Sequence, residues 1–156
     1  MAKVRFANLA DFPEMLAMGE DMHNESPRYR VHDFNVEKSA EILVNMHGRE
    51  NCVLLVAEAA GHLTGMLLGF VAENTFCSGL VASELAVYVA PHARGSSAAS
   101  RLVGAFEAWA FAHGASEISL GISTEVEADR TSKFYQRMGY APTGSVLMKR
   151  VSITQH

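Results

Sequence analysis

The residues best able to do chemistry lie between Ser83 and Arg101. An expected strand, Ser83–Val89, leads into the run Arg94-Gly95-Ser96-Ser97-Ala98-Ala99, where a long helix is expected to begin. Small residues at a helix start leave backbone N–H groups unpaired and accessible, and the helix dipole makes that end positive. Such a turn can hold a diphosphate, and Arg94 would add a permanent positive charge beside it. An ordinary serine-capped helix has the same pattern, so the turn alone leaves both interpretations open.

The composition predicts one globular domain over residues 1–156. Apolar residues make up 49% of the chain and charged residues 19%, which is ordinary for a domain of this length. Thirteen Lys and Arg against seventeen Asp and Glu give a net charge of -4, which argues against nucleic acid or an anionic membrane as the main partner. The apolar stretch Ala59–Ala72 is too short to span a bilayer, and no apolar block follows the first residues as in a secretory signal. We therefore expect a cytoplasmic protein.

Strands and helices must hold the turn in place, and apolar periodicity predicts where they lie. The first helix follows a cap at Asn8 or Asp11 and gives way to a polar connection, His23–Asp33. The other helices are expected at Val36–His47, Ser96–His113 and Glu127–Met138. Strands are expected at Val4–Ala7, Cys52–Glu58, Leu63–Glu73, Ser83–Val89, Glu117–Ile122 and Ala141–Val151. The element order predicts an α/β chain. Cys52 and Cys77 fall in apolar, strand-like runs, where we expect buried thiols and no disulfide framework.

Two segments, in this order, resemble the motifs of the GCN5-related N-acetyltransferases, the GNAT superfamily. The turn is similar to motif A, Arg/Gln-x-x-Gly-x-Gly/Ala between a strand and a helix: Arg94 matches its first position and Ala99 its last, whereas Ser97 replaces the central glycine. Residues 134–140, Phe-Tyr-Gln-Arg-Met-Gly-Tyr, resemble motif B, in which a helix ends as Phe-Tyr-x-x-x-Gly-Phe/Tyr. Ala128 stands where many members carry an asparagine that contacts the cofactor.

The resemblance implies a central, mostly antiparallel sheet with one splayed strand pair, flanked by helices. It implies transfer of an acetyl group from acetyl-CoA to a primary amine of a small molecule or protein, by direct attack in a ternary complex. No metal is expected, because the seven histidines are scattered without ligand spacing. The strand before motif A would pair with the pantetheine arm, and the turn would hold the pyrophosphate. The expected cofactor-binding residues are Val87, Tyr88, Val89, Arg94, Gly95, Ser96, Ser97, Ala98, Ala99 and Ser100.

Direct transfer needs a base for the amine and an acid for the departing thiolate. An amine with a pKa of about 10.4 costs roughly 4–5 kcal/mol to deprotonate at pH 7, so a positioned base or water relay is useful. Period-two alternation places Glu84 on the same face as Ala86 and Tyr88, and we predict Glu84 as this base, with Glu73 in reserve. A solvated strand-end carboxylate is the alternative. Tyr135, matching the motif B tyrosine, is the predicted acid, and a packing tyrosine is its alternative.

In this family the acceptor pocket is usually shaped by the first two helices and the loop between them. Glu25 and Tyr29 are the predicted acceptor contacts, since Glu25 would attract a cationic amine. Arg28 and Arg30 would instead favour an anionic group, and mixed charge is also usual in a solvated loop. The resemblance further implies a possible homodimer, for which the final strand would offer an exposed edge.

A second function remains open beside the enzyme. Ser97 and Ala128 depart from the family pattern, as in a catalytically weakened acyl-CoA-binding or protein-interaction module on the same fold. The sequence contains neither a Gly-x-x-x-x-Gly-Lys-Ser/Thr loop nor a Gly-x-Ser-x-Gly elbow. This argues against an unrelated nucleotide binder and against a hydrolase.

Overall fold

The structure is a computed structural model that describes residues 2–151. The chain forms two compact units, one up to Val126 and one from Glu127 onward. The first contains the whole sheet and most of the helices, and the second contains the last helix. No helix within residues 2–151 is long and apolar enough to cross a membrane.

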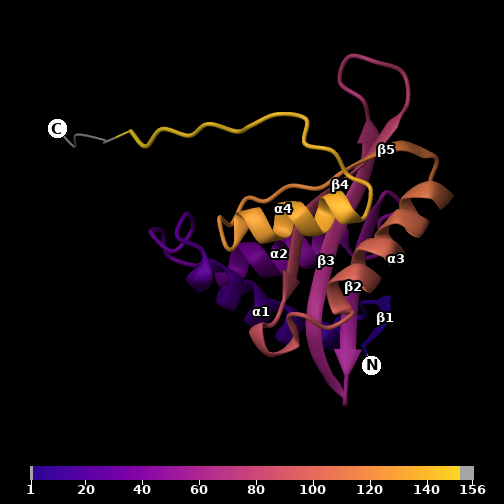
Figure 1. Cartoon of the computed structure of the whole chain (residues 1–156). Coiled ribbons are helices and arrows are strands. Elements are labelled where there is room, and N and C mark those ends of the chain that lie inside the picture. The colour runs from indigo at the N-terminus through magenta and orange to yellow at the C-terminus, as the bar shows by residue number, and fades with distance from the viewer. Residues whose placement is uncertain (1, 152–156) are drawn as a thin grey trace. The chain divides into compact units, whose positions relative to one another are not determined.

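A five-stranded mixed sheet forms the centre of the first unit (Figure 1). Its strands are adjacent in chain order, and all neighbours are antiparallel except the last pair, which is parallel. Ala60 and Gly61 adopt left-handed φ angles of 52° and 79°, as a two-residue hairpin turn between twisted strands requires. The predicted mixed, mostly antiparallel sheet is confirmed. The strands are β1 (Lys3–Phe6), β2 (Cys52–Ala59), β3 (His62–Glu73), β4 (Leu80–Val89) and β5 (Ala115–Ser119).

Helices flank the sheet, and local signals explain where they begin. The Asn8 side chain accepts from the Ala10 amide and caps a short 3-10 turn, η1 (Leu9–Asp11), and Pro13 lies in the first turn of the helix that follows. Asn35 caps the second helix through the Lys38 amide. The α-helices are α1 (Phe12–Glu25), α2 (Val36–Met46), α3 (Ala98–Ala112) and, in the second unit, α4 (Ala128–Arg137); η2 (Pro91–Ala93) is a second 3-10 turn.

The two faces of the sheet bury different helices. Met15 of α1 and Leu43 of α2 belong to one buried cluster with alternate residues of β2 and β3, such as Leu68. On the other face Phe106 of α3 is fully buried. A Cβ on Gly69 of β3 would lie 2.4 Å from Phe106 Cε2, so this glycine lets the α3 ring approach the sheet.

The predicted final strand, Ala141–Val151, is wrong. Residues 141–151 have no regular secondary structure, and the side chains of Val146 and Leu147 are 86% and 92% exposed. Apolar, strand-prone residues are not sufficient, because a strand also needs a neighbour for its backbone hydrogen bonds. Pro142 lacks a donor and Gly144 weakens β structure, which lowers the preference for a strand further.

Cys77 also departs from the prediction. It lies exposed in the loop between β3 and β4, whereas Cys52 is half-buried, and both are free thiols. The loop is fixed locally, since the Cys77 amide donates to Asn74 Oδ1 at 3.2 Å. The apolar strand expected here therefore ends before Cys77.

Candidate active site

The strands β4 and β5 separate after Ser83. Their parallel register runs from Leu80 opposite Ala115 to Ser83 opposite Ser119, whereas β4 continues to Val89. Within the described residues, the end of β4 is paired with β3 alone. This is the splayed pair that the family resemblance implies.

Along the end of β4, the backbone N–H and C=O groups of alternate residues point in opposite directions. The Ala90 amide donates to the Thr64 carbonyl at 2.8 Å, which makes these residues a hydrogen-bonded antiparallel pair. Hydrogen-bonded and non-hydrogen-bonded pairs alternate along an antiparallel ladder, so the backbone N–H and C=O of Tyr88 face β3. Those of Val87 and Val89 face away from β3, into the opening between β4 and β5 that begins after Ser83. The Tyr88 side chain is buried in the cluster on the α1 face. A pantetheine arm in the opening would therefore meet backbone groups of Val87 and Val89.

The turn before α3 has the accessible amides predicted for an anion site. Gly95 has a φ of 82°, which favours glycine. The Ser96 Oγ accepts from the Ala98 amide at 3.2 Å, whereas the Ser97 side chain makes no cap. The turn lies at the surface, with Gly95 and Ser96 exposed. Within this turn, as the structure describes it, four amides donate no hydrogen bond: those of Gly95, Ser97, Ala99 and Ser100.

Arg94 and Glu25 form an ion pair that the sequence did not predict. The Arg94 Nη2 lies 2.7 Å from Glu25 Oε2, and Nη1 donates to Oε1. The Arg94 Nε donates to the Val89 carbonyl at 3.0 Å, and the guanidinium lies 5.7 Å from the centre of the Tyr88 ring. The hydrogen bond from Arg94 holds the pKa of Glu25 below its usual value. A predicted cofactor residue and a predicted acceptor residue therefore meet.

Glu84 occupies the point where β4 and β5 separate. Its Oε1 accepts a hydrogen bond from the Gly121 amide, just after β5, at 2.8 Å. Burial raises the pKa of this carboxyl, and the Gly121 hydrogen bond partly offsets the effect. Glu84 is half-buried, and its role as the base stays a prediction beside the alternative of a strand-end carboxylate.

The predicted face of Glu84 is wrong because β4 contains a β-bulge. Gly69 is opposite Glu84 and Leu68 is opposite Ala86, so Leu85 has no partner in the register. Neighbouring residues of β3 point to opposite faces, and a bulge resets the alternation of its own strand. Glu84 therefore shares the α3 face with Gly69, while Ala86 and Tyr88 lie on the α1 face.

The loop after α1 is fastened to the segment after β5. Ser26 is fully buried, its Oγ donates to the Thr124 carbonyl at 2.6 Å, and the same oxygen accepts from the Tyr29 amide at 3.2 Å. Arg28 Nη1 donates to the Ser123 carbonyl at 3.1 Å. Sequence reasoning missed this role of Ser26, since a serine in a polar loop carries no signal of burial.

Tyr135 belongs to the second unit. It is the buried residue of α4, with ring centres of Phe134 and Tyr140 at 5.6 Å and 6.0 Å. Gly139 has a φ of 99° and ends the helix, as the motif B glycine predicts. Ala128 is the first residue of α4.

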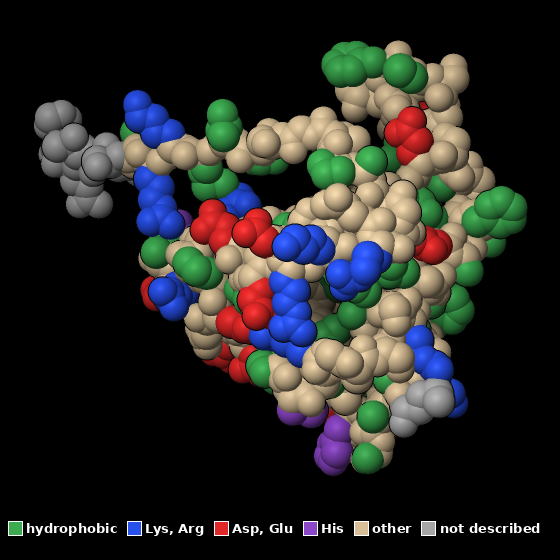
Figure 2. All heavy atoms as spheres, in the orientation of Figure 1, with side chains coloured by type: hydrophobic (Ala, Val, Ile, Leu, Met, Phe, Trp, Pro, Cys, Tyr) green, Lys and Arg blue, Asp and Glu red, His purple; other side chains and the backbone are tan. Residues whose placement is uncertain are grey.

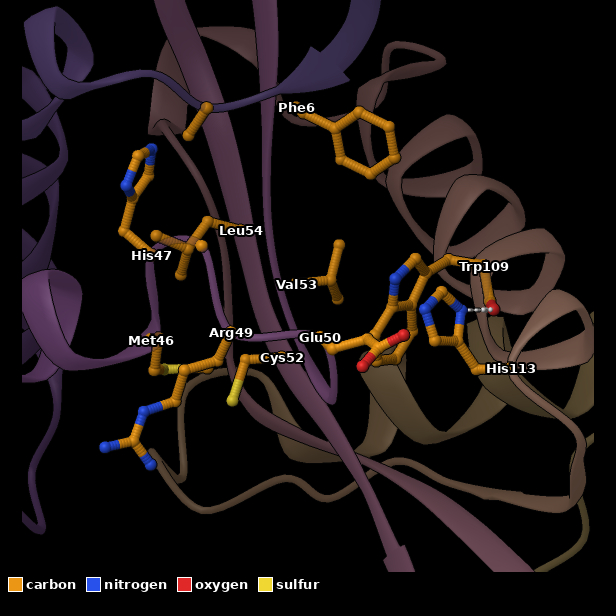
Figure 3. Close-up of a pocket in the computed structure, with 12 residues that line it drawn as sticks. Phe6, Met46, His47, Arg49, Glu50, Cys52, Val53, Leu54, Trp109 and His113 are labelled. Carbon is orange, nitrogen blue, oxygen red and sulfur yellow. Dashed lines mark hydrogen bonds between the residues drawn. The ribbon is translucent and has the colours of Figure 1, made fainter.

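A cavity of about 360 Å³ lies at the start of β2, beside the C-terminal end of α3. Figure 3 shows Trp109 and His113 lying together at its wall, which Glu50 also lines. His113 Nδ1 donates to the Trp109 carbonyl at 2.8 Å. No residue predicted for the active site lines this cavity.

Charged side chains of both signs are mixed on one face of the molecule. Basic side chains are interspersed with acidic ones on the face that Figure 2 shows. Within residues 2–151, no group of three or more His, Cys, Asp or Glu side chains could hold a metal ion.

Comparison with known proteins agrees with the geometry. The sequence profile of the acetyltransferase (GNAT) family matches residues 18–140. No curated protein matches the sequence. The fold is similar to that of a transcriptional regulator from Bacillus halodurans C-125, with 20% identity and a TM-score of 0.79 over 97% of this chain and 100% of that chain.

Two solved acetyltransferases are also similar. The aminoglycoside N-acetyltransferase AAC(6')-Iy, in complex with CoA, has 18% identity and a TM-score of 0.77 over 97% of this chain and 95% of that chain. Glucosamine-6-phosphate N-acetyltransferase from Arabidopsis thaliana has 13% identity and a TM-score of 0.74 over 97% of this chain and 99% of that chain. At these identities the likeness establishes the fold.

Proposed function

This chain belongs to the acetyltransferase (GNAT) family, and from that premise we propose that it moves the acetyl group of acetyl-CoA to a primary amine by direct attack in a ternary complex. The observation that carries the proposal is the turn before α3. Its unpaired amides at Gly95, Ser97, Ala99 and Ser100 lie at a helix start beside the open end of β4.

The donor site fits acetyl-CoA in two ways. The amides of the turn and the α3 dipole suit the pyrophosphate, and the backbone of Val87 and Val89 suits the amide-containing pantetheine arm. Ser97, at the place of the motif glycine, makes no side-chain cap, so its hydroxyl is available to donate to a phosphate. Acetyl-CoA supplies an activated thioester, and the protein's part is to bind it, orient it and handle the protons.

We assign the base to Glu84, acting directly or through water. The amine nitrogen bonds to the acetyl carbon and the C–S bond breaks, which gives an N-acetyl amine and free CoA. Glu84 takes the proton that the amine loses. Its raised pKa, due mainly to burial, brings its proton affinity nearer to that of a working base at neutral pH.

Tyr135 is the proposed acid for the CoA thiolate. The assignment rests on its place in motif B, since its phenol is protonated at neutral pH. Solvent then restores the proton on Tyr135 and removes the one on Glu84. Loss of Tyr135 would leave part of the rate, because positioning of the reactants supplies much of the acceleration.

The acceptor is proposed to be a small molecule or protein bearing a primary amine, with Glu25 and Tyr29 among its contacts. Two proteins of similar fold are an aminoglycoside N-acetyltransferase and a glucosamine-6-phosphate N-acetyltransferase, and both of these substrates carry amines on sugar rings. Amino sugars are therefore among the acceptors to test.

Calorimetry with acetyl-CoA, followed by a thiol-release assay over aminoglycosides, amino sugars, polyamines and peptides, tests the proposal. We expect saturable binding and release of CoA with at least one amine. Absence of binding at millimolar acetyl-CoA would overturn the proposal. Binding without turnover for any amine would favour the catalytically weakened module.

Four expectations accompany this function. A cytoplasmic location and a reaction without a metal follow from the sequence and remain predictions. A single functional domain over residues 1–156 and a homodimer are proposed from the family. Light scattering on a size-exclusion column measures the mass of the particle, and a monomer at micromolar concentration would contradict the dimer.

A further inference from the structure

The Glu25–Arg94 ion pair joins the two halves of the proposed active site. Glu25 is the last residue of α1, which leads into the acceptor loop, and Arg94 precedes the cofactor turn. The side chains of Arg94 and Glu25 are only 27% and 29% exposed. Two hydrogen bonds between planar groups give this pair a fixed geometry. The charge that should attract phosphate is therefore neutralised by a carboxylate.

Arg94 also binds a backbone group that faces the opening between β4 and β5. Its Nε donates to the Val89 carbonyl at 3.0 Å, and Val89 is one of the residues whose backbone faces that opening. A pantetheine arm that pairs with Val89 would compete with Arg94 for this carbonyl. The unpaired amides that follow Gly95 would at the same time place phosphates next to the guanidinium. Both effects favour movement of Arg94 away from its present partners.

Asp21 is a second carboxylate near the end of α1 that carries Glu25. Asp21 precedes Glu25 by one helical turn, so both lie on one side of α1. Burial raises the pKa of Tyr88, and the negative charges of Glu25 and Asp21 raise it further, while Arg94 opposes them. Without the guanidinium, this end of α1 would present net negative charge beside Tyr88.

We propose that the diphosphate of acetyl-CoA draws Arg94 away from Glu25, and that the released Glu25, with Asp21, binds the cationic amine of the acceptor. This inference rests on the proposed function and names the class of acceptor, a small molecule that is positively charged at neutral pH. One ion pair in the free protein becomes two in the ternary complex. Each ligand alone disrupts the pair, whereas both together satisfy all the charges, so donor and acceptor bind cooperatively.

A permanent brace is the competing role for Glu25. In that case Glu25 holds Arg94 in place for the phosphates, and its loss weakens CoA binding. Under partner exchange, the carboxylate competes with the phosphates, and its loss strengthens CoA binding. The two roles therefore predict opposite signs for one measurement.

Calorimetry of Glu25→Gln with CoA and with pantetheine, which lacks phosphate, tests the exchange. We expect Kd for CoA to fall about fivefold, equivalent to about 1 kcal/mol for a partly exposed pair. Pantetheine should gain less than CoA does, because its arm competes with Arg94 only for the Val89 carbonyl and brings no phosphate to the guanidinium. Unchanged or weaker CoA binding in Glu25→Gln would overturn the exchange.

Spermidine, a polycationic amine, tests the acceptor half. For the wild-type protein we expect CoA to tighten spermidine binding about fivefold, by the reciprocity of coupled sites. In Glu25→Gln this tightening should disappear. Equal spermidine affinity with and without CoA in the wild-type protein would overturn the assignment of Glu25 to the acceptor.

Glu20→Gln is the matched control, because Glu20 is exposed on the same helix and the variant makes the same change in charge. We expect it to bind CoA and spermidine like the wild-type protein. Thermal unfolding of each variant shows whether it is folded. A wild-type protein that binds no CoA would overturn the proposed function itself, whereas normal CoA binding without a gain in Glu25→Gln would overturn only the exchange.

Discussion

The Glu84 carboxylate accepts a hydrogen bond from the Gly121 amide at 2.8 Å, across the point where β4 and β5 separate. The contact ties the two strands together where their own ladder ends, at Ser83 opposite Ser119. Because the amide is a donor, it favours the ionised carboxylate, while burial favours the protonated one; burial is the larger effect. Glu84 is thus a carboxyl whose proton is held more tightly than usual at the closed end of the opening.

Glu84→Gln should lower kcat/KM by about 100-fold, since general base catalysis contributes roughly 10²–10⁴-fold. In the wild-type protein the rate should rise with pH through the raised pKa of Glu84, because the ionised form is the base. The variant should lose this step in the pH profile while CoA affinity stays the same. A profile with the same step in both proteins would assign the base elsewhere, with Glu73 next to be tested.

The same substitution should affect stability in a pH-dependent way. The pKa of Glu84 is higher in the folded protein than in the unfolded chain, so the folded state binds this proton more tightly. The contribution of Glu84 to stability is therefore complete below its usual pKa and is lost as pH rises through the folded value. In urea unfolding, the free energy of unfolding of Glu84→Gln should rise relative to that of the wild type between pH 4 and pH 8. A constant difference would contradict the assigned shift.

Asp11→Asn should destabilise the protein at neutral pH. The Arg5 guanidinium donates to Asp11 at 2.7 and 2.9 Å, and this lowers the pKa of Asp11 from its usual 3.8. Its contribution is present above that value and is lost as pH falls through the lower folded pKa. We expect a loss of about 2 kcal/mol at pH 7, typical of a hydrogen bond to a charged group, and a smaller one at pH 3. Asp33→Asn, on an exposed residue, is the control, and an equal loss in both variants would contradict the role of the ion pair.

Local signals in the sequence predicted most of the elements but not the details of β4. The cap at Asn8 is set by nearby residues, and the structure places it on the 3-10 turn that leads into α1. The bulge at Leu85 is invisible to periodicity, because it depends on how β3 and β4 align. One extra residue was enough to move Glu84 to the other face.

The partners of the site residues could not be predicted for a similar reason. Glu25 and Arg94 are 69 residues apart in the chain, and each alone has an ordinary role for its type. Ser26 reaches Thr124 across 98 residues. Such pairs are decided by the tertiary fold. The predicted strand after Gly144 is wrong for a different reason. Its residue types favour a strand, but no strand of the described residues pairs with it.

Gly69→Ala should destabilise the protein by overpacking. The new Cβ would lie 2.4 Å from Phe106 Cε2 and 2.9 Å from Cζ, and both residues sit in a close-packed layer. Such insertions cost typically about 1–3 kcal/mol. Phe106→Leu in the same chain should recover part of the loss, since it removes the clashing atoms. Strictly additive losses in the double variant would contradict the close contact.

Tyr135→Phe should lower turnover far more than it weakens cofactor binding. The variant keeps the ring that packs near Phe134 and Tyr140 and removes only the hydroxyl that would protonate the thiolate. We expect kcat to fall by about 100-fold, a typical contribution of a general acid, with Kd for acetyl-CoA within about twofold of the wild type. Tyr140→Phe is the matched control, because the family motif accepts Phe or Tyr at that position, and it should retain its turnover. Equal turnover in Tyr135→Phe and the wild-type protein would end the assignment and leave the thiolate to be protonated by solvent.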